Sequence, residues 1–420
     1  MIKIKVPGDK SISHRAVMLG AIAEGITEIE GFLTGADCLS TIDCFRKLGV
    51  EIEQEGEHVI VHGVGLMGLQ ESESIIDIGN SGTTIRLISG ILAGQDFTTR
   101  LTGDASIRRR PMGRILEPLS LMGAEILGRE NNNKAPFSIR GGSLKEITYK
   151  TPVASAQIKS AILFAGLYAH GTTKVIEPEK SRNHSELMLK GFGAEVEEGD
   201  NYSSVIGFPK LIGQKLLVPG DISSAAFFIG AALIIPGMEV YIENVGLNET
   251  RTGIIDVFLE MGGNIQIINE RYASGEKTGD LIVKYSKLKG IKINKEIIPR
   301  LVDEIPLLAV VASQAEGRTI VYGAEELKVK ETDRLKAITK ELSKMGANIE
   351  ETEDGLIIKG GNKLKYAEIE SYDDHRIAMS CAIAGLVSEG GVKIDNPSCV
   401  DISFPGFFEK LETLKSYNEV

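Results

Sequence analysis

The stretch RAVMLGAIAEG, residues 15–25, predicts a helix of small residues that ends at a glycine. TEIE, residues 27–30, follows it with the alternation of a short strand. The same glycine turn recurs about every 70 residues along the 420-residue chain, at Gly25, Gly94, Gly171, Gly237, Gly317 and Gly390. We therefore expect six copies of one structural unit.

A second helix repeats out of phase with the first. Each copy ends at a glycine and leads into an alternating strand, as in MGAEI at 122–126 and MGANI at 345–349. Asp354-Gly355 then predicts a two-residue hairpin turn. Each unit should hold two helices and roughly four strands.

Six such units exceed what one hydrophobic core supports, so we expect a mixed α/β (α+β) fold with two domains of three units each. The best boundary lies near Val218-Pro219-Gly220-Asp221. The predicted domains are residues 9–219, and residues 1–8 together with 220–420. In this division the N-terminal strand crosses over to pair with the C-terminal half.

Composition excludes several classes of function. The net charge of −11 and the pI near 5.3 argue against general nucleic-acid binding. No run of 18 uncharged apolar residues and no signal-peptide core is present, so neither a membrane span nor secretion is expected. The four sparse cysteines indicate free thiols in a reducing cytoplasm, and the six scattered histidines predict no protein-bound metal.

Polar and cationic residues collect just before the predicted helices. Seven blocks carry them: PGDKSISHRA (7–16), GNSGTTIRL (79–87), RRRPMGR (108–114), ASAQIKSAILFAGL (154–167), DEIPLLAV (303–310), VKETDRL (329–335) and DDHRIAM (373–379). A helix N-terminus already carries partial positive charge, so added Lys and Arg are unfavourable unless an anion joins them. The pattern predicts a site for a polyanion that bears phosphate and carboxylate groups.

Taken singly, each block has a plainer interpretation. GNSG is also a capped helix start, residues 108–110 also suit a solvated basic face, and Asp303 and Glu304 also suit helix caps. Lys10-Ser11 lacks the spacing of a phosphate-binding P-loop. Their joint recurrence at equivalent positions favours the functional interpretation.

The seven ordered blocks resemble the enolpyruvyl transferases, in particular the branch that acts on shikimate 3-phosphate. The resemblance implies two domains of three βαβαββ units, an inverse α/β barrel in each, and an open cleft between them. It implies transfer of the enolpyruvyl group of phosphoenolpyruvate to the 5-hydroxyl of shikimate 3-phosphate, a step of aromatic amino acid biosynthesis, with no cofactor. The branch that uses UDP-N-acetylglucosamine differs, because it has Lys-Asn in the first block and a reactive cysteine in a loop of its first domain.

The resemblance also implies roles for individual residues. Shikimate 3-phosphate would contact Lys10, Ser11, Arg15, Ser155, Ala156, Gln157, Arg182, Asp303 and Lys330. Phosphoenolpyruvate would contact Lys10, Gly82, Arg110, Gln157, Arg334 and Arg376. Asp303 would be the base, Glu331 the proton donor, and Lys10 the group that stabilises charge and the departing phosphate.

Two positions depart from the family pattern. Ala156 stands where many members have a second serine and offers only backbone contacts, and Ile402 replaces a lysine that binds phosphoenolpyruvate. A non-catalytic anion-binding repeat protein would keep the cations but would not need Asp303 and Glu331. We expect a monomeric cytoplasmic enzyme whose partners are these small molecules.

Overall fold

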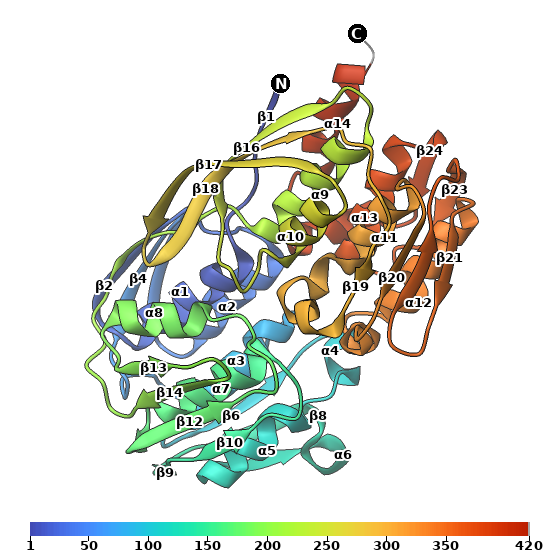
Figure 1. Ribbon diagram of the computed structural model, residues 1–420. Coiled ribbons are helices and arrows are strands. Elements are labelled where there is room, and N and C mark those ends of the chain that lie inside the picture. The colour runs from blue at the N-terminus through green and yellow to red at the C-terminus, as the bar shows by residue number, and fades with distance from the viewer. Residues whose placement is uncertain (419–420) are drawn as a thin grey trace. The chain divides into compact units, whose positions relative to one another are not determined.

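The computed structural model describes residues 1–418 and divides into two compact units (Figure 1). We call Gly8–Val218 with Ala273–Glu276 the N-terminal unit. Met1–Pro7, Pro219–Tyr272 and Lys277–Val420 form the C-terminal unit. Each unit has its own cluster of buried apolar side chains.

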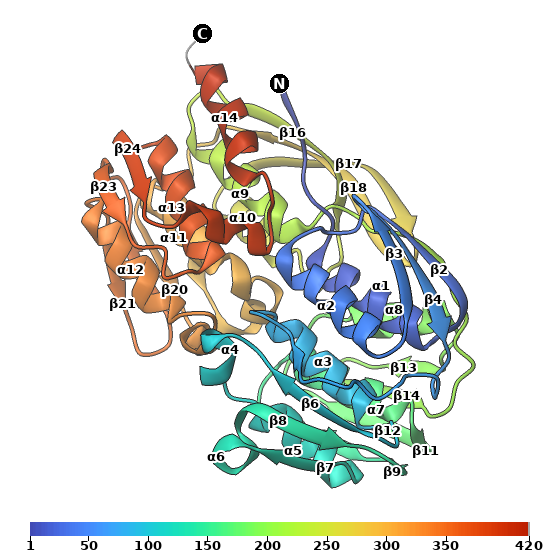
Figure 2. The same cartoon turned by 180° about the vertical axis from the view of Figure 1, so that it is seen from behind.

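The N-terminal unit contains three four-stranded sheets that share one pattern (Figure 2). In each sheet a first strand pairs in parallel with a second, and the second pairs with an antiparallel hairpin. The first sheet is β15 (Lys215–Leu217), β2 (Glu24–Glu30), β4 (His58–Val64) and β3 (Glu51–Glu55). The second is β5 (Ile76–Asp77), β6 (Thr98–Thr102), β8 (Lys134–Arg140) and β7 (Glu125–Gly128). The third is β10 (Thr148–Lys150), β12 (Thr172–Ile176), β14 (Tyr202–Ile206) and β13 (Val196–Glu198), and a separate pair joins β9 (Leu144–Lys145) to β11 (Ala169–His170).

Helices fill the inside of the N-terminal unit. Its three central helices are almost wholly buried: α1 (Lys10–Ile22), α3 (Gly82–Leu92) and α7 (Ala156–Gly166). Their alanines, glycines and serines allow the helices to approach closely, as at Gly90, where a Cβ would lie 2.1 Å from the Ala161 carbonyl oxygen. The remaining helices are α2 (Ala36–Lys47), α4 (Ala105–Arg109), α5 (Gly113–Met122), α6 (Arg129–Asn132) and α8 (His184–Phe192).

The C-terminal unit repeats the sheet pattern twice. One sheet is β1 (Ile2–Lys5), β16 (Glu239–Gly246), β18 (Glu276–Lys284) and β17 (Asn264–Ala273). The other is β19 (Lys292–Ile293), β20 (Arg318–Val321), β22 (Leu356–Lys359) and β21 (Asn348–Glu351). The N-terminal strand β1 pairs in parallel with β16, so the expected crossover of the first strand is confirmed.

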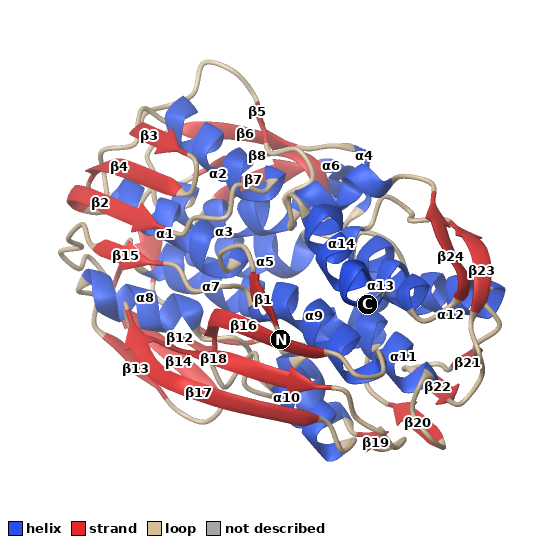
Figure 3. Cartoon of the chain, turned by 90° about the horizontal axis from the view of Figure 1, so that it is seen from above, coloured by secondary structure: helices blue, strands red, loops and turns tan. Residues whose placement is uncertain are grey.

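Buried helices again lie inside the strands, as Figure 3 shows by colour for each unit. The central ones are α9 (Ile222–Ile234), α11 (Ile305–Ser313) and α13 (His375–Leu386), and all residues of α9 and α11 are buried. The others are α10 (Gly253–Glu260), α12 (Arg334–Lys344) and α14 (Phe407–Asn418), with short 3-10 helices η1 (Lys295–Arg300), η2 (Val302–Glu304), η3 (Glu325–Val329) and η4 (Pro397–Ile402).

The sixth repeat differs from the expected four strands. Its sheet has only β23 (Lys365–Ile369) and β24 (Glu389–Ile394), which pair in parallel. The chain then enters η4 at Pro397, which lacks the N–H that a strand would donate. α14 follows, and its Phe407 packs edge-on against Phe227 of α9 with ring centroids 5.8 Å apart. The mixed α/β fold with helices inside the sheets is otherwise as expected.

Candidate active site

The N-terminal unit places the predicted anion ligands at the starts of its central helices. α1, α3 and α7 begin at Lys10, Gly82 and Ala156, directly in the motif blocks. The side chains of Asp9, Ser81 and Ser155 cap them by accepting hydrogen bonds from the first helical turn. Other first-turn N–H groups of each helix have no partner within the helix, which suits them to an anionic ligand.

Arg15 connects α1 to two other helices of the unit. Its Nε donates to Ser185 Oγ at 2.7 Å on α8, and its Nη2 donates to Ser160 Oγ at 2.9 Å on α7. Its Nη1 donates to the Ser11 carbonyl oxygen at 2.9 Å. The side chain is 3% exposed, and these three hydrogen bonds all go to neutral oxygen atoms.

Lys10 and Gln157 are also held by neighbouring helices. The Lys10 ammonium forms an ion pair with Asp37 of α2, which is itself only 6% exposed. Gln157 Nε2 donates to Thr83 Oγ1 at 3.2 Å, which joins the first turns of α7 and α3. Ser11, Ser155 and Ala156 are half-buried at the starts of α1 and α7, and Arg182 is half-buried two residues before α8 begins.

Gly82 lies against two guanidinium groups. A Cβ at this position would be 2.6 Å from Arg110 Nη1 and 2.7 Å from Arg86 Nη1. Arg86 also donates to the Gly82 carbonyl oxygen at 3.0 Å and to the Pro111 carbonyl oxygen at 3.2 Å. Two cations beside a positive helix end form a site suited to phosphate or carboxylate.

The C-terminal unit gathers its five predicted residues into one ionic cluster. Arg334 is its centre and is 2% exposed. Its Nε donates to Asp374 Oδ2 at 2.8 Å, its Nη1 to Asp303 Oδ1 at 3.2 Å, and its Nη2 to Glu331 Oε2 at 2.6 Å. Burial alone would lower the pKa of Arg334, but the carboxylates of Asp374, Glu331 and Asp303 raise it, so the guanidinium stays charged.

The other two cations of this cluster reach the same aspartate. Lys330 Nζ lies 4.0 Å from Asp303 Oδ1. Arg376 Nη1 donates to the Asp303 carbonyl oxygen at 3.2 Å and lies 3.5 Å from Glu304 Oε1. Asp303 therefore faces two cationic side chains through its carboxylate and a third through its backbone.

Several residues of these clusters escaped sequence reasoning. Arg86 lies one helical turn after Gly82 in the quoted block, and that spacing is the signal that could have identified it. Asp374 and Glu304 stand in the quoted blocks, but their positions before helices suit simple caps. Glu304 receives a hydrogen bond from Ser223, which in turn accepts from Arg251 Nη2 at 2.8 Å, and no local signal predicts that contact.

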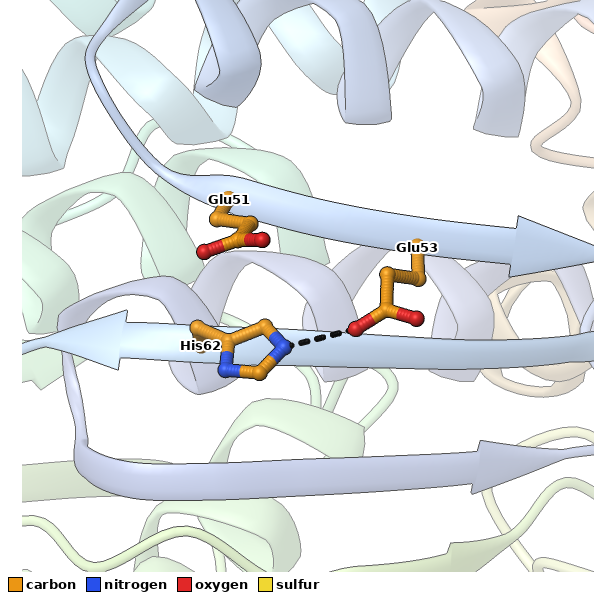
Figure 4. Close-up of side chains that lie close together, drawn as sticks. All are labelled: Glu51, Glu53 and His62. Atoms are coloured by element: carbon orange, nitrogen blue, oxygen red, sulfur yellow. Dashed lines mark hydrogen bonds and ion pairs between the residues drawn. The ribbon is translucent and has the colours of Figure 1, made fainter.

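One group of possible metal ligands lies on the surface of the N-terminal unit. Glu51 and Glu53 of β3 face His62 of β4, and His62 Nε2 lies 2.9 Å from Glu53 Oε1 (Figure 4). Both glutamates are exposed, and strand pairing places Glu51 directly opposite His62. A cross-strand hydrogen bond on a solvated sheet accounts for this arrangement.

The four cysteines are free and buried. Among residues 1–418 no helix is both long enough and apolar enough to span a membrane.

The segment around Arg110 contains no cysteine, in contrast to the UDP-N-acetylglucosamine branch.

Comparisons with known proteins agree with these features. The family model of EPSP synthase (3-phosphoshikimate 1-carboxyvinyltransferase) matches residues 2–411. A 3-phosphoshikimate 1-carboxyvinyltransferase from Thermoanaerobacter sp. (strain X514) is 60% identical over 412 residues, which cover 98% of this chain and 97% of the relative. One from Brevibacillus brevis is 56% identical over 408 residues, or 97% and 96% of the two chains.

A solved structure points the same way. EPSP synthase from Acinetobacter baumannii superposes with a TM-score of 0.86 at 48% identity, covering 97% of this chain and 94% of that one. The resemblance drawn from the seven blocks and the expected fold are therefore both confirmed. Lys10, Arg15 and Arg110 supply the cations of the N-terminal unit, and carboxylates surround Arg334 in the C-terminal unit. The family model and the relatives match nearly the whole chain, so the chain belongs to the EPSP synthase (3-phosphoshikimate 1-carboxyvinyltransferase) family.

Proposed function

We propose that the residues of these two clusters carry out the reaction of the family in this chain. The reaction transfers the enolpyruvyl group of phosphoenolpyruvate to the 5-hydroxyl of shikimate 3-phosphate and releases phosphate. The name shared by relatives up to 60% identical supports this assignment. The observation that carries the residue roles is the concentration of cations at the starts of α1 and α3 together with the carboxylates around Arg334.

Shikimate 3-phosphate is assigned to the starts of α1 and α7. Lys10, Ser11 and Arg15 supply cations and a hydroxyl, and Ser155, Ala156, Gln157 and Arg182 receive the phosphate. Ala156 has no polar side chain, so it would bind the phosphate through its backbone. Its place at the start of α7 supports this assignment, because first-turn N–H groups of a helix bind anions. Lys330 and Asp303 are assigned to the ring hydroxyls.

Phosphoenolpyruvate is assigned to Gly82, Arg110, Arg334 and Arg376, with Lys10 and Gln157 reaching both substrates. Because Gly82 has no side chain, the Arg110 guanidinium has room to lie at the start of α3. Phosphate and carboxylate groups match the planar donor face of arginine. Two domains, residues 9–219 and residues 1–8 with 220–420, are proposed to supply these residues.

Asp303 is proposed to take the proton from the 5-hydroxyl as its oxygen attacks the central carbon of phosphoenolpyruvate. Glu331 delivers a proton to the methylene carbon, which becomes a methyl group in the tetrahedral intermediate. The C–O bond to phosphate then breaks, one methyl proton returns to Glu331 and restores the double bond, and the proton held by Asp303 passes to the departing phosphate, so both carboxyl groups regain their starting forms. Arg334 Nη1 at 3.2 Å and Lys330 Nζ at 4.0 Å fix the position of the Asp303 carboxylate, which supports its assignment as the base. Lys10 stabilises the charge on the departing phosphate.

Phosphate release from phosphoenolpyruvate tests the proposal, measured with and without shikimate 3-phosphate for wild type and Asp303→Ala. We expect release only when both substrates are present, and a rate at least about 100-fold lower in the variant because general-base catalysis contributes that much. Asp256→Ala is a matched control, because Asp256 is a half-exposed carboxylate of the same unit that pairs with Arg300 at 2.7 Å. Release with UDP-N-acetylglucosamine instead would assign the other branch, and tight binding of both anions without release would indicate a non-catalytic protein.

A further inference from the structure

Three charged side chains are buried together in the N-terminal unit. They are Lys159 on α7, Glu177 just after β12, and Glu186 on α8. Lys159 Nζ lies 2.9 Å from Glu177 Oε2 and 2.8 Å from Glu186 Oε1, and the three side chains are 1%, 3% and 0% exposed. Apolar side chains of similar volume often stabilise a core as well as a buried ion pair does, so stability alone is a weak reason for this cluster.

Glu177 holds two separate backbone segments. Its Oε1 accepts a hydrogen bond from the N–H of Ser155 at 3.2 Å, and its Oε2 accepts one from the N–H of Ser181 at 3.4 Å. Lys159 Nζ completes the arrangement by donating to the Ser181 carbonyl oxygen at 3.3 Å. One carboxylate and its ammonium partner therefore fix Ser155 relative to Ser181.

These are the two segments assigned to the phosphate of shikimate 3-phosphate. Ser155 caps α7 and precedes Ala156 and Gln157, and Ser181 directly precedes Arg182. A carboxylate so close to a phosphate site would repel the ligand unless a cation compensated it. Burial tends to lower the pKa of Lys159, but Glu186 and Glu177 raise it, so this lysine is charged and offsets part of the negative charge of the two glutamates.

We propose that Glu177, paired with Lys159, is a positioning residue that sets the spacing between the start of α7 and Arg182 for the phosphate of shikimate 3-phosphate. The inference rests on the proposed function and adds a residue pair to it. Lys159 itself is too deeply buried to touch a substrate, so it acts through Glu177 and Ser181.

The test compares two glutamate-to-glutamine variants of the same cluster. Glu177→Gln removes the charge that holds Ser155 and Ser181. Glu186→Gln is the matched control, because the partners of Glu186 along residues 1–418 are Lys159 and the Ser203 hydroxyl at 2.7 Å, so it holds neither segment. We expect the KM for shikimate 3-phosphate to rise about tenfold in Glu177→Gln alone, the loss that follows from a weakened charged hydrogen bond. The kcat and the KM for phosphoenolpyruvate should change by less than about threefold in both variants.

Equal KM values for shikimate 3-phosphate in the two variants would overturn the inference, as would a fall in kcat with that KM unchanged. If Glu177→Gln does not fold, Glu177→Asp decides, because it keeps the charge beside Lys159 but withdraws the oxygens from the two N–H groups. Calorimetric titration with shikimate 3-phosphate gives the affinity without turnover. A wild type that binds it but releases no phosphate would contradict the proposed function, whereas an active wild type with unchanged Glu177→Gln affinity would contradict the positioning role.

Discussion

Gly82 and Arg110 lie so close together that a methyl group on Gly82 would be 2.6 Å from Nη1 of Arg110. The crowded atom is the end of a flexible side chain, so alanine at this position would displace the guanidinium and leave the helix intact. The absence of a side chain at the start of α3 thus determines where the Arg110 charge can lie. Since phosphoenolpyruvate is assigned to this site, the Gly82–Arg110 contact should control the affinity for that substrate more than for the other.

Gly82→Ala should raise the KM for phosphoenolpyruvate about tenfold, equivalent to about 1.4 kcal/mol of weakened charge contact, with the KM for shikimate 3-phosphate nearly unchanged. Steady-state kinetics with each substrate varied in turn measures both values. Gly191→Ala is the control, because Gly191 lies inside α8 and a methyl group added there would meet no atom within 4 Å. An unchanged KM for phosphoenolpyruvate in Gly82→Ala would contradict the assignment.

Arg334→Lys should lower both stability and turnover. Lysine keeps the positive charge but cannot donate to Asp374, Asp303 and Glu331 at once, which Arg334 does from three nitrogen atoms. Breaking a buried ion network of this kind typically costs about 3–5 kcal/mol of unfolding free energy. Urea unfolding measures the change in stability. The kcat should fall by about 100-fold or more, because Asp303 and Glu331 lose the hydrogen bonds from Arg334 that position both carboxylates.

The exposed Arg318 of β20 supplies the matched control for that experiment. Arg318→Lys should change the unfolding free energy by less than about 0.5 kcal/mol. A kcat for Arg334→Lys equal to that of this control would mean that the position of Asp303 does not depend on Arg334.

Short-range patterns in the sequence accounted for much of the fold. The recurring glycine turns predict the repeat, and the small-residue run at 15–25 predicts the helix that α1 forms, because both signals lie within a few residues. The missing hairpin of the sixth repeat is not predicted by the sequence. The chain there forms η4 and α14, and Phe407 of α14 packs against Phe227, 180 residues away in sequence. Asp303, Glu331 and Arg334 itself are sequence candidates, but Asp374 is not. Its hydrogen bond with Arg334 is a tertiary contact between residues 40 positions apart, which no local pattern predicts.

The cysteine thiols should react only after unfolding. Burial raises the pKa of Cys44 and of Cys399 to about 12, and it raises the pKa of Cys381 further. The thiolate is the reactive form, so a thiol reagent at about pH 8 should modify these residues very slowly in the native protein. Counting modified thiols in buffer and in denaturant checks this, and all four should react in the unfolded chain. Fast modification of Cys44 in the native protein would show that α2 opens locally.

His14 should make the protein less stable in mild acid. Its side chain is fully buried, and the charges of Lys10 and Arg15 act on it. Desolvation is the largest cause that lowers the pKa of His14 well below the usual value of 6.5, and repulsion from these two cations adds to it. Between the folded pKa and 6.5 the unfolded chain binds a proton that the native protein does not, so the stabilisation is complete above pH 6.5 and is lost as the pH falls. The slope contributed by one such group approaches about 1.4 kcal/mol per pH unit.

The measurement is the unfolding free energy of wild type and His14→Gln between about pH 5 and 7.5, a window above the usual pKa of carboxylates. His14 Nδ1 lies 2.7 Å from Thr41 Oγ1, which continues to Thr84 Oγ1 at 2.7 Å, so glutamine also removes part of a hydroxyl chain that links α1, α2 and α3. That loss lowers stability equally at every pH, whereas the titration changes only the slope. We therefore expect a lower but flatter curve for His14→Gln, and parallel curves for the two proteins would show that His14 is not the group that titrates.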